Sequence, residues 1–216
     1  LTMSLGYNVT FLHNEVTEVN NGTGFIEGGS FGVGQPAPSR MQVGKPLGYF
    51  YGYKTNGIFQ NQAEVDAAPS QIALGAEAQA GDIRYVDMNN DGVINTSDRT
   101  DIGSPIAAST MGFNMQFGYK NFDFVTYLFA SIGNDMVRNY ERSLTDVNRL
   151  DYVLDRWTGE GTSNSAPRVT TSATSNNVFS DYFVEDASFL RIQNIQLGYS
   201  INPNHLTKAG ITKFRV

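Results

Sequence analysis

The sequence predicts an all-β protein and, within that class, an antiparallel transmembrane β-barrel. Three observations favour this class: strands in which apolar and polar residues alternate, connections that are alternately long and short, and a low content of charge. Of the 216 residues, 17% are charged, 12% are aromatic and 22 are Gly. Charged residues make up about 25% of an average soluble domain, and aromatic residues favour strands, so this composition disfavours a helical enzyme.

Alternation with a period of two defines the expected strands. In the first segment, alternate positions are apolar: Leu1, Met3, Leu5, Tyr7, Val9 and Phe11. The same pattern returns at residues 111–119 and 195–201. Residues 122–132 carry apolar groups at both parities, which leaves the facing of that strand open.

A change of parity predicts an irregularity in the last strand. Leu190 and Ile192 fall on the opposite parity from Ile195. One extra residue in a strand restores the facing of the residues beyond it. We therefore expect a β-bulge near Gln193 or Asn194.

The lengths of the connections favour a barrel over a soluble sandwich. A first long loop spans residues 20–109, a tight turn lies around Lys120 and Asn121, and a second long loop spans residues 133–187. Long extracellular loops and short periplasmic turns are typical of outer-membrane barrels. A short helix is expected in the second loop, from Asp135 to Trp157, because apolar residues recur there at helical spacing: Val147, Leu150, Val153 and Leu154.

Charge and residue content exclude several functions. The net charge of −6, from 15 basic and 21 acidic residues, disfavours nucleic acid as a partner. The absence of Cys excludes disulfides, thiol nucleophiles and Cys-ligated zinc. The segment GGSFG (28–32) matches the G-x-S-x-G pattern, but it lacks the strand–turn–helix context that a nucleophilic Ser30 would need. We predict no enzymatic activity.

Residues 87–98, DMNNDGVINTSD, match the twelve-position calcium loop pattern, although the surroundings do not predict a helix pair. Calcium takes six to eight oxygen ligands, and the pattern supplies donors from Asp87, Asn89, Asp91, the Val93 carbonyl and Asp98 around a turn at Gly92. The alternative is an Asp/Asn-rich turn without metal, since these residues also favour turns for backbone reasons. We expect a structural Ca²⁺ that rigidifies the first long loop.

Aromatic residues gather at 49–59, where Tyr49, Tyr51 and Tyr53 alternate. Packing, or a girdle at the membrane interface, accounts for them most simply. A second interpretation is that these three rings stack on a substrate.

Five segments resemble, in the same order, the C-terminal barrel region of SusC/RagA-like TonB-dependent outer-membrane transporters of Bacteroidota. They are GKPLGYFYGYKTNGIFQ (44–60), GDIRYVDMNNDGVINTSDRTDIGSP (81–105), FGYKNFDF (117–124), RWTGEGTSNSAPR (156–168) and YFVEDASFLRIQNIQLGYSI (182–201). The resemblance implies that residues 1–216 are a partial C-terminal portion of a 22-stranded barrel. Polar residues of each strand would line the lumen, and apolar residues would face outer-membrane lipid.

The resemblance also implies the partners and the activity. A SusD-like surface lipoprotein would deliver an oligosaccharide or a peptide, and TonB with ExbB and ExbD would supply energy through an N-terminal region that this sequence lacks. A homodimer is left open. Because the sequence starts at Leu1 within a strand, we expect a piece of a longer polypeptide that transports nothing alone. The alternative function is a soluble calcium-binding, carbohydrate-binding β-sandwich module.

Overall fold

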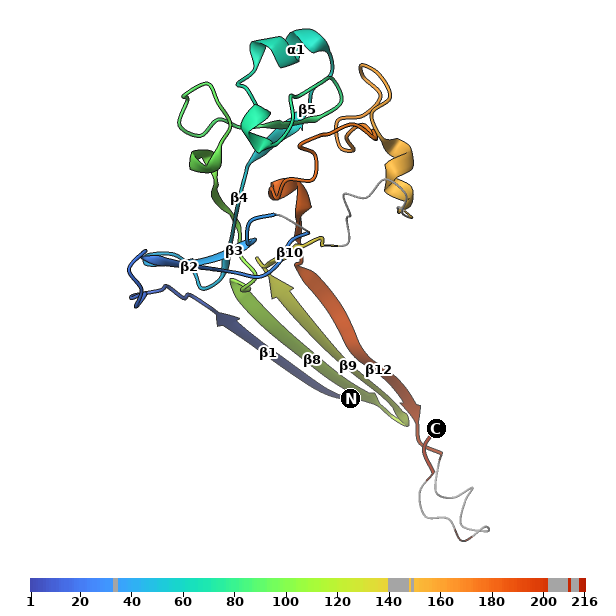
Figure 1. The fold of residues 1–216 in the computed structure, drawn as a ribbon. Helices are drawn as coiled ribbons and strands as arrows, with labels where there is room; N and C mark the ends of the chain where they lie inside the picture. The colour runs from blue at the N-terminus through green and yellow to red at the C-terminus, as the bar shows by residue number, and fades with distance from the viewer. Residues whose placement is uncertain (33–34, 140–147, 149, 202–209, 211–213) are drawn as a thin grey trace. The chain divides into compact units, whose positions relative to one another are not determined.

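The computed structural model describes residues 1–32, 35–139, 148, 150–201, 210 and 214–216 (Figure 1). The chain divides into two compact units. The first, called the sheet unit below, comprises Leu1–His13, Ile106–Asn134 and Asp186–Val216. The second, called the loop unit, comprises Asn14–Pro105 and Asp135–Glu185.

The sheet unit is built on one antiparallel sheet of four strands in the order β1-β8-β9-β12, which lie side by side in Figure 1. The strands are β1 (Thr2–Phe11), β8 (Ser109–Tyr119), β9 (Phe122–Ile132) and β12 (Phe189–Tyr199). Each has 10 or 11 residues, close to the roughly 9–11 residues of a membrane-crossing strand. The predicted tight turn at Lys120 and Asn121 joins β8 to β9, and Lys120 adopts φ 53° there.

Antiparallel pairing aligns the apolar residues of the four strands. Met3 pairs with Phe117, Phe117 with Phe124, and Phe124 with Leu197. Residues that pair directly across antiparallel strands point to the same face of the sheet. One face is therefore apolar across its whole width.

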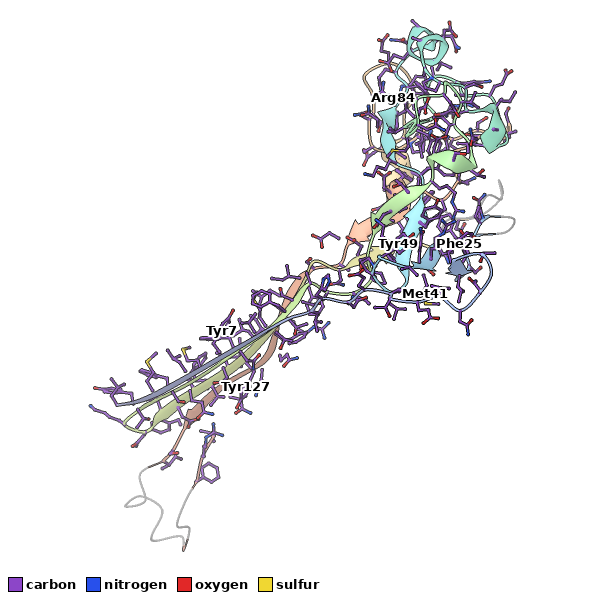
Figure 2. The ribbon with its side chains drawn as sticks, turned by 90° about the vertical axis from the view of Figure 1, so that its left-hand side faces the viewer. Tyr7, Phe25, Met41, Tyr49, Arg84 and Tyr127 are labelled. Atoms are coloured by element: carbon purple, nitrogen blue, oxygen red, sulfur yellow. The ribbon has the colours of Figure 1, made fainter. Side chains whose placement is uncertain are left out.

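The register also settles the facing that the sequence leaves open in β9. Phe122, Phe124 and Leu128 pair with apolar-face residues of β8, which puts Tyr127 and Phe129 on the opposite face. Tyr7 belongs to the apolar face, so Tyr7 and Tyr127, both labelled in Figure 2, point to opposite sides of the sheet.

The predicted bulge in β12 is confirmed. Ile192 pairs with Leu128 and Asn194 pairs with Tyr127, so Gln193 has no partner in the ladder. This single extra residue brings Ile192 and Ile195 to the same apolar face.

The loop unit holds short strands and turns drawn from both long connections. One sheet has the order β2-β3-β4-β7, β5 pairs with β6, and β10 pairs with β11. The strands are β2 (Phe25–Gly28), β3 (Ser39–Gln42), β4 (Tyr49–Gly52), β5 (Thr55–Ile58), β6 (Ile83–Tyr85), β7 (Thr100–Gly103), β10 (Asp135–Val137) and β11 (Val184–Asp186). Four 3₁₀ turns lie at Ile72–Leu74, Thr96–Asp98, Asp151–Asp155 and Asp181–Phe183.

Two aromatic clusters form the interior of the loop unit. Phe31 and Phe50 of the first long connection pack with Phe179 and Phe183 of the second. The other cluster consists of Tyr53, Ile83, Tyr85 and Ile94. The first of these cores needs both long connections, so the loop unit is not two independent loops.

The helix expected from Asp135 to Trp157 is wrong wherever the structure describes that segment. Asp135–Val137 is strand β10, and Asp151–Asp155 is a single 3₁₀ turn. Residues 140–147 and 149 lie outside the described residues. Asp135–Val137 pairs with β11, and such tertiary partners outweigh the intrinsic propensity of a short segment.

The helix α1 (Gln62–Ala67) lies instead in the first long connection. Its N-terminus is capped by Asn61, whose Oδ1 accepts the Glu64 N–H at 3.0 Å. Asn followed three residues later by Glu is a local N-terminal signal that the sequence carries at this point.

Candidate functional site

The apolar face of the sheet unit is largely bare. Exposed fractions reach 60% for Met3, 64% for Tyr7 and 72% for Leu197. Soluble monomers rarely expose contiguous apolar surface on this scale. The face is therefore suited to contact with lipid. Among the described residues, no helix combines the length and the apolar character that crossing a membrane would require.

On the opposite face of the sheet, polar side chains of one strand pair with glycines of the neighbouring strand. Asn114 pairs with Gly6, and Asn8 pairs with Gly112. A Cβ on Gly6 would lie 2.5 Å from Asn114 Oδ1, so the amide occupies the space that any larger residue would need. This face also carries Arg215, which forms an ion pair with Asp123.

A buried carboxylate joins the two long connections within the loop unit. The Asp82 side chain is fully buried, and its Oδ1 accepts hydrogen bonds from Arg168 Nε at 2.7 Å, Asn176 Nδ2 at 2.9 Å and Thr174 Oγ1 at 3.2 Å. Its Oδ2 accepts from Arg168 Nη2 at 3.0 Å and from the Gln79 N–H at 2.9 Å. A buried charge is stable only when it is paired and hydrogen-bonded, so this network fixes how the two connections meet.

Gly81 and Trp157 meet beside this network. Gly81 adopts φ 89°, and a Cβ at this position would collide with the Trp157 indole ring. The Arg168 N–H donates to the Gly81 carbonyl at 2.8 Å. The segments containing GDIR and RWTG are thus neighbours in space, a relationship that sequence reasoning missed because no local pattern marks residues so far apart.

The predicted calcium loop is closed by its own hydrogen bonds. Asp87 is partly exposed; its Oδ1 accepts from the Asn90 N–H at 2.6 Å and its Oδ2 from the Gly92 N–H at 2.8 Å. Desolvation acts to raise the pKa of Asp87, but the backbone N–H donors outweigh it and hold that pKa below its ordinary value. Asp91 and Asn89 are exposed, and Asp91 Oδ1 accepts from the Val93 N–H at 2.9 Å.

Asp98, the last donor of the pattern, is buried and engaged elsewhere. Its Oδ1 accepts from the Met88 N–H and its Oδ2 from the Asn95 N–H, both at 2.8 Å. Within the described residues, no group of three or more His, Asp or Glu side chains lies close enough to hold a metal ion. Asp87, Asn89, Asp91 and the Val93 carbonyl offer oxygen donors of the kind that calcium binds. Asp98 instead caps the 3₁₀ turn at Thr96–Asp98 and closes the loop through the Met88 N–H. Calcium binding stays a prediction.

The three tyrosines of the predicted stacking site have different surroundings. Tyr49 and Tyr53 are buried, with 2% and 4% of their surfaces exposed, and burial raises the pKa of both hydroxyls. Tyr51 is half-buried, and the guanidinium carbons of Arg40 and Arg99 lie 3.4 Å and 4.6 Å from its ring centre. Tyr49 is labelled in Figure 2. Packing thus accounts for Tyr49 and Tyr53, which are both buried, and stacking on a substrate stays a prediction.

Comparison with known proteins supplies the relatives of this chain. No family model matches the chain. TonB-dependent receptor P3 of Formosa agariphila is 27% identical over 219 residues, which cover 100% of this chain and 21% of that receptor. TonB-dependent receptor SusC of Bacteroides thetaiotaomicron is 29% identical over 204 residues, which cover 92% of this chain and 18% of SusC.

A solved structure shares the fold. The structure of the RagAB peptide transporter matches with a TM-score of 0.67 at 18% identity, over 99% of this chain and 22% of the matched chain. The chain spans about a fifth of the length of the relatives that it matches.

These relatives are receptors and not enzymes, in agreement with the sequence prediction. The relationship assigns the chain to the bacterial outer membrane, as predicted, and the sheet with one bare apolar face is the corresponding piece of barrel wall. The chain is therefore similar along its length to TonB-dependent receptors that include SusC, and it shares the fold of the RagAB structure.

Proposed function

We propose that this chain is part of an outer-membrane importer that takes up oligosaccharides or peptides together with a SusD-like lipoprotein. Energy would come from TonB with ExbB and ExbD through parts of the receptor that this chain does not include. The chain contributes a section of the barrel wall and two long connections that fold together. No bond of the substrate is made or broken.

The observation that carries this proposal is the aligned apolar row across four strands, such as Met3, Phe117, Phe124 and Leu197. Strands of this length with one apolar and one polar face match a lipid-facing and lumen-facing barrel wall. A soluble calcium-binding module would bury this face, so its exposure does not favour the alternative function.

Import is tested by deleting the gene for the full-length receptor in its source bacterium. We expect loss of growth on one glycan or peptide supplied as the sole carbon or nitrogen source, with rescue by a plasmid copy. Uptake should also stop when TonB is removed. Growth of the deletion strain equal to the wild type on every glycan and peptide would contradict the proposal.

The partner is tested by affinity purification of the tagged receptor from detergent-extracted membranes. We expect a lipoprotein of SusD type to co-purify in a near-equal amount. The mass of the purified complex also reports whether the receptor forms a homodimer. A receptor that elutes without any lipoprotein, after mild detergent and after crosslinking, would contradict this part of the proposal.

We further propose that residues 87–98 bind Ca²⁺ through Asp87, Asn89, Asp91 and the Val93 carbonyl. The support is the donor chemistry and the sharp turn at Gly92, which has φ 86°. The loop is already anchored in the interior of the loop unit, because Ile94 is buried and its N–H donates to the Ser70 carbonyl at 2.8 Å. Bound calcium would add a second point of attachment within the loop.

Calcium titration of the purified receptor, after treatment with chelator, tests this assignment. We expect a dissociation constant of about 10⁻⁴–10⁻³ M, as in extracellular calcium modules, and slower cleavage of the loop by protease. Asp87→Asn with Asp91→Asn should abolish both effects. Asp66→Asn, which removes an exposed carboxylate of α1, is the matched control. Wild-type receptor that shows neither heat of binding nor protection would end the calcium proposal.

Substrate stacking on the tyrosines is proposed for Tyr51, since it is half-buried whereas Tyr49 and Tyr53 are buried. Tyr51→Ala should reduce uptake while leaving the amount of assembled receptor unchanged. Tyr49→Ala should instead reduce assembly, because Tyr49 is buried and its hydroxyl donates to Gln42 Oε1 at 3.0 Å. Unchanged uptake by Tyr51→Ala would favour packing for all three residues.

A further inference from the structure

A row of exposed aromatic residues ends the apolar face of the sheet unit beside the β8–β9 turn. Tyr119 pairs with Phe122, and Phe122 pairs with Tyr199. All three residues are exposed, and the ring centres of Phe122 and Tyr199 lie 4.8 Å apart. Tyrosine combines an apolar ring with a polar hydroxyl, which suits it to the level where hydrocarbon meets water. The row therefore marks one boundary of the lipid-facing surface.

The length of β8 supports this boundary. From Ser109 to Tyr119 the strand has 11 residues. With a rise of about 3.4 Å per residue and a tilt of about 35–45°, it covers about 24–28 Å along the membrane normal. The apolar band of an outer-membrane barrel is about 25 Å tall, and its short turns face the periplasm. The Tyr119 row thus lies at the head-group level of the inner leaflet.

The turn places a lysine directly beyond this row. Lys120 is exposed, and its Nζ lies 5.4 Å from the ring centre of Tyr119. Its φ of 53° is left-handed, a conformation that glycine adopts without strain and that Gly, Asn or Asp usually supply in two-residue hairpin turns. The turn therefore keeps an ammonium group where glycine would be less strained. Such an exception points to a role for the side chain.

No carboxylate of the sheet unit neutralises Lys120. The unit contains two acidic residues: Asp123, which forms an ion pair with Arg215, and Asp186, which precedes the far end of β12. Lys120 forms no ion pair with any residue that the structure describes. Residues 187–216, which include the undescribed stretches of this unit, contain no Asp or Glu. The ammonium group therefore needs a counter-charge from outside the sheet unit.

We propose that this end of the apolar face binds a phospholipid of the inner leaflet, with the Lys120 ammonium group on its phosphate. Charge complementarity supports the phosphate, since a lysine near a membrane surface attracts anionic lipid. Continuity with the lipid-facing rows supports an acyl chain beside it, because Phe117 and Phe124 form the next row of the same face. The proposal concerns the lipid around the barrel wall and does not depend on the proposed import function.

The test uses the full-length receptor in detergent and a photoreactive phosphatidylglycerol whose diazirine lies near the glycerol end of one acyl chain. Crosslinked peptides are mapped after digestion with pepsin, which does not rely on cleavage at Lys. At lipid concentrations below saturation, we expect labelling of the segment Tyr119–Phe122 to fall about fivefold in Lys120→Gly, since one lysine near the surface contributes a factor of about that size. A diacylglycerol probe, which lacks the phosphate, should label this segment weakly and to the same extent in both proteins.

Lys120→Gly separates the ammonium group from the fold of the turn. Glycine accepts the left-handed conformation, so the amount of heat-modifiable receptor should be unchanged or higher. Lys120→Gln, which keeps a long side chain at the turn, should lose labelling as Lys120→Gly does, and Lys120→Arg should retain it. Lys54→Gln removes an exposed ammonium group from the loop unit and is the matched control, which should leave labelling unchanged.

Four results would overturn the proposal. They are equal labelling of the wild type and Lys120→Gly, an equal loss in Lys54→Gln, equal labelling by the diacylglycerol probe, or displacement of the probe by lipopolysaccharide but not by unlabelled phosphatidylglycerol.

Discussion

Asp82 and Arg168 are 86 residues apart in the chain and face each other through two hydrogen bonds, Nε to Oδ1 at 2.7 Å and Nη2 to Oδ2 at 3.0 Å. Both groups are largely withdrawn from water, with 1% of the Asp82 side chain and 15% of the Arg168 side chain exposed. This two-point contact joins the first long connection to the second. It explains why the two connections form one compact unit.

Removing one partner of this pair should destabilise the loop unit strongly. Asp82→Ala leaves the guanidinium buried without a counter-charge, and such losses cost about 3–5 kcal/mol. Hydrogen exchange of loop-unit amides in the full-length receptor measures the change. Lys45→Gln is the control, because the Lys45–Asp101 pair is 44% and 36% exposed and should contribute less than about 1 kcal/mol. Equal effects of the two substitutions would contradict a structural role for the buried pair.

Gly81→Ala should destabilise the same region by a different mechanism. A left-handed backbone conformation costs a non-glycine residue about 1–2 kcal/mol, and the new methyl group would displace Trp157 at a further cost of about 1–3 kcal/mol. Gly159→Ala, in the second connection, has nothing within 4 Å of the added methyl group and should be close to neutral. Trp157 fluorescence and protease sensitivity report both outcomes. If Gly81→Ala changed neither Trp157 fluorescence nor protease sensitivity, the indole ring would not pack on this glycine.

Deletion of Gln193 should be tolerated, in contrast to deletion of Gln196. Gln193 is the unpaired residue of the bulge, so its removal leaves the facing of Ile192 and Ile195 unchanged. Removal of Gln196 turns Leu197 and Tyr199 to the polar face, because a shift of one residue reverses every side chain beyond it. The amount of heat-modifiable receptor in the outer membrane measures assembly. Equal loss in both deletions would argue against the bulge.

Exchanging Gly6 and Asn114 tests the packing on the polar face. Gly6→Asn alone places a second side chain where the Asn114 amide lies, and overpacking of this kind costs about 1–3 kcal/mol. The double variant Gly6→Asn with Asn114→Gly restores one large and one small residue to the pair. We expect the single variant to lower the unfolding temperature of the receptor and the double variant to recover most of the loss. Additive losses would show that the two positions do not share one space.

Acid should loosen the loop at residues 87–98. The folded pKa of Asp87 lies below the ordinary value of 3.8, so the folded state holds its proton less tightly than the unfolded state. The associated stability is present above pH 3.8 and is lost as the pH falls through the lowered folded pKa. Hydrogen exchange of this loop, corrected for intrinsic rates, should show more protection in the wild type than in Asp87→Asn at pH 6. The difference in protection between the wild type and Asp87→Asn should disappear at strongly acidic pH. A difference in protection that does not vary with pH would contradict a lowered pKa of Asp87.

The sheet unit could be predicted from the sequence because its strands carry local signals. Alternation located β1 and β8, and the parity change between Ile192 and Ile195 located the bulge. The facing of β9 could not be predicted, since Phe124 and Val125 are both apolar and only pairing with β8 separates them.

The loop unit was far less predictable, for the opposite reason. The hydrogen-bond partners of Asp82, Arg168 and Asn176, belong to the second long connection and are more than 80 residues away in the sequence. No sequence pattern predicts which residues meet over such a separation. Packing was the favoured interpretation of Tyr49 and Tyr53, and both are buried, but no local pattern identifies Ile83 and Tyr85 as the residues that pack with Tyr53. The spacing of Leu150, Val153 and Leu154 favoured a helix, whereas the structure has a single 3₁₀ turn at Asp151–Asp155.

The division of the loop unit between two stretches of chain has a consequence for the order of folding. The β8–β9 hairpin is local and can form early, because its two strands are joined by a two-residue turn. Asn14–Pro105 and Asp135–Glu185 complete a shared interior only together, so neither stretch reaches its final state before the other arrives. Contacts of such long sequence separation form slowly. Folding of the loop unit is therefore the late, cooperative step in the maturation of this part of the receptor. A destabilising substitution in either stretch should delay the folding of both stretches.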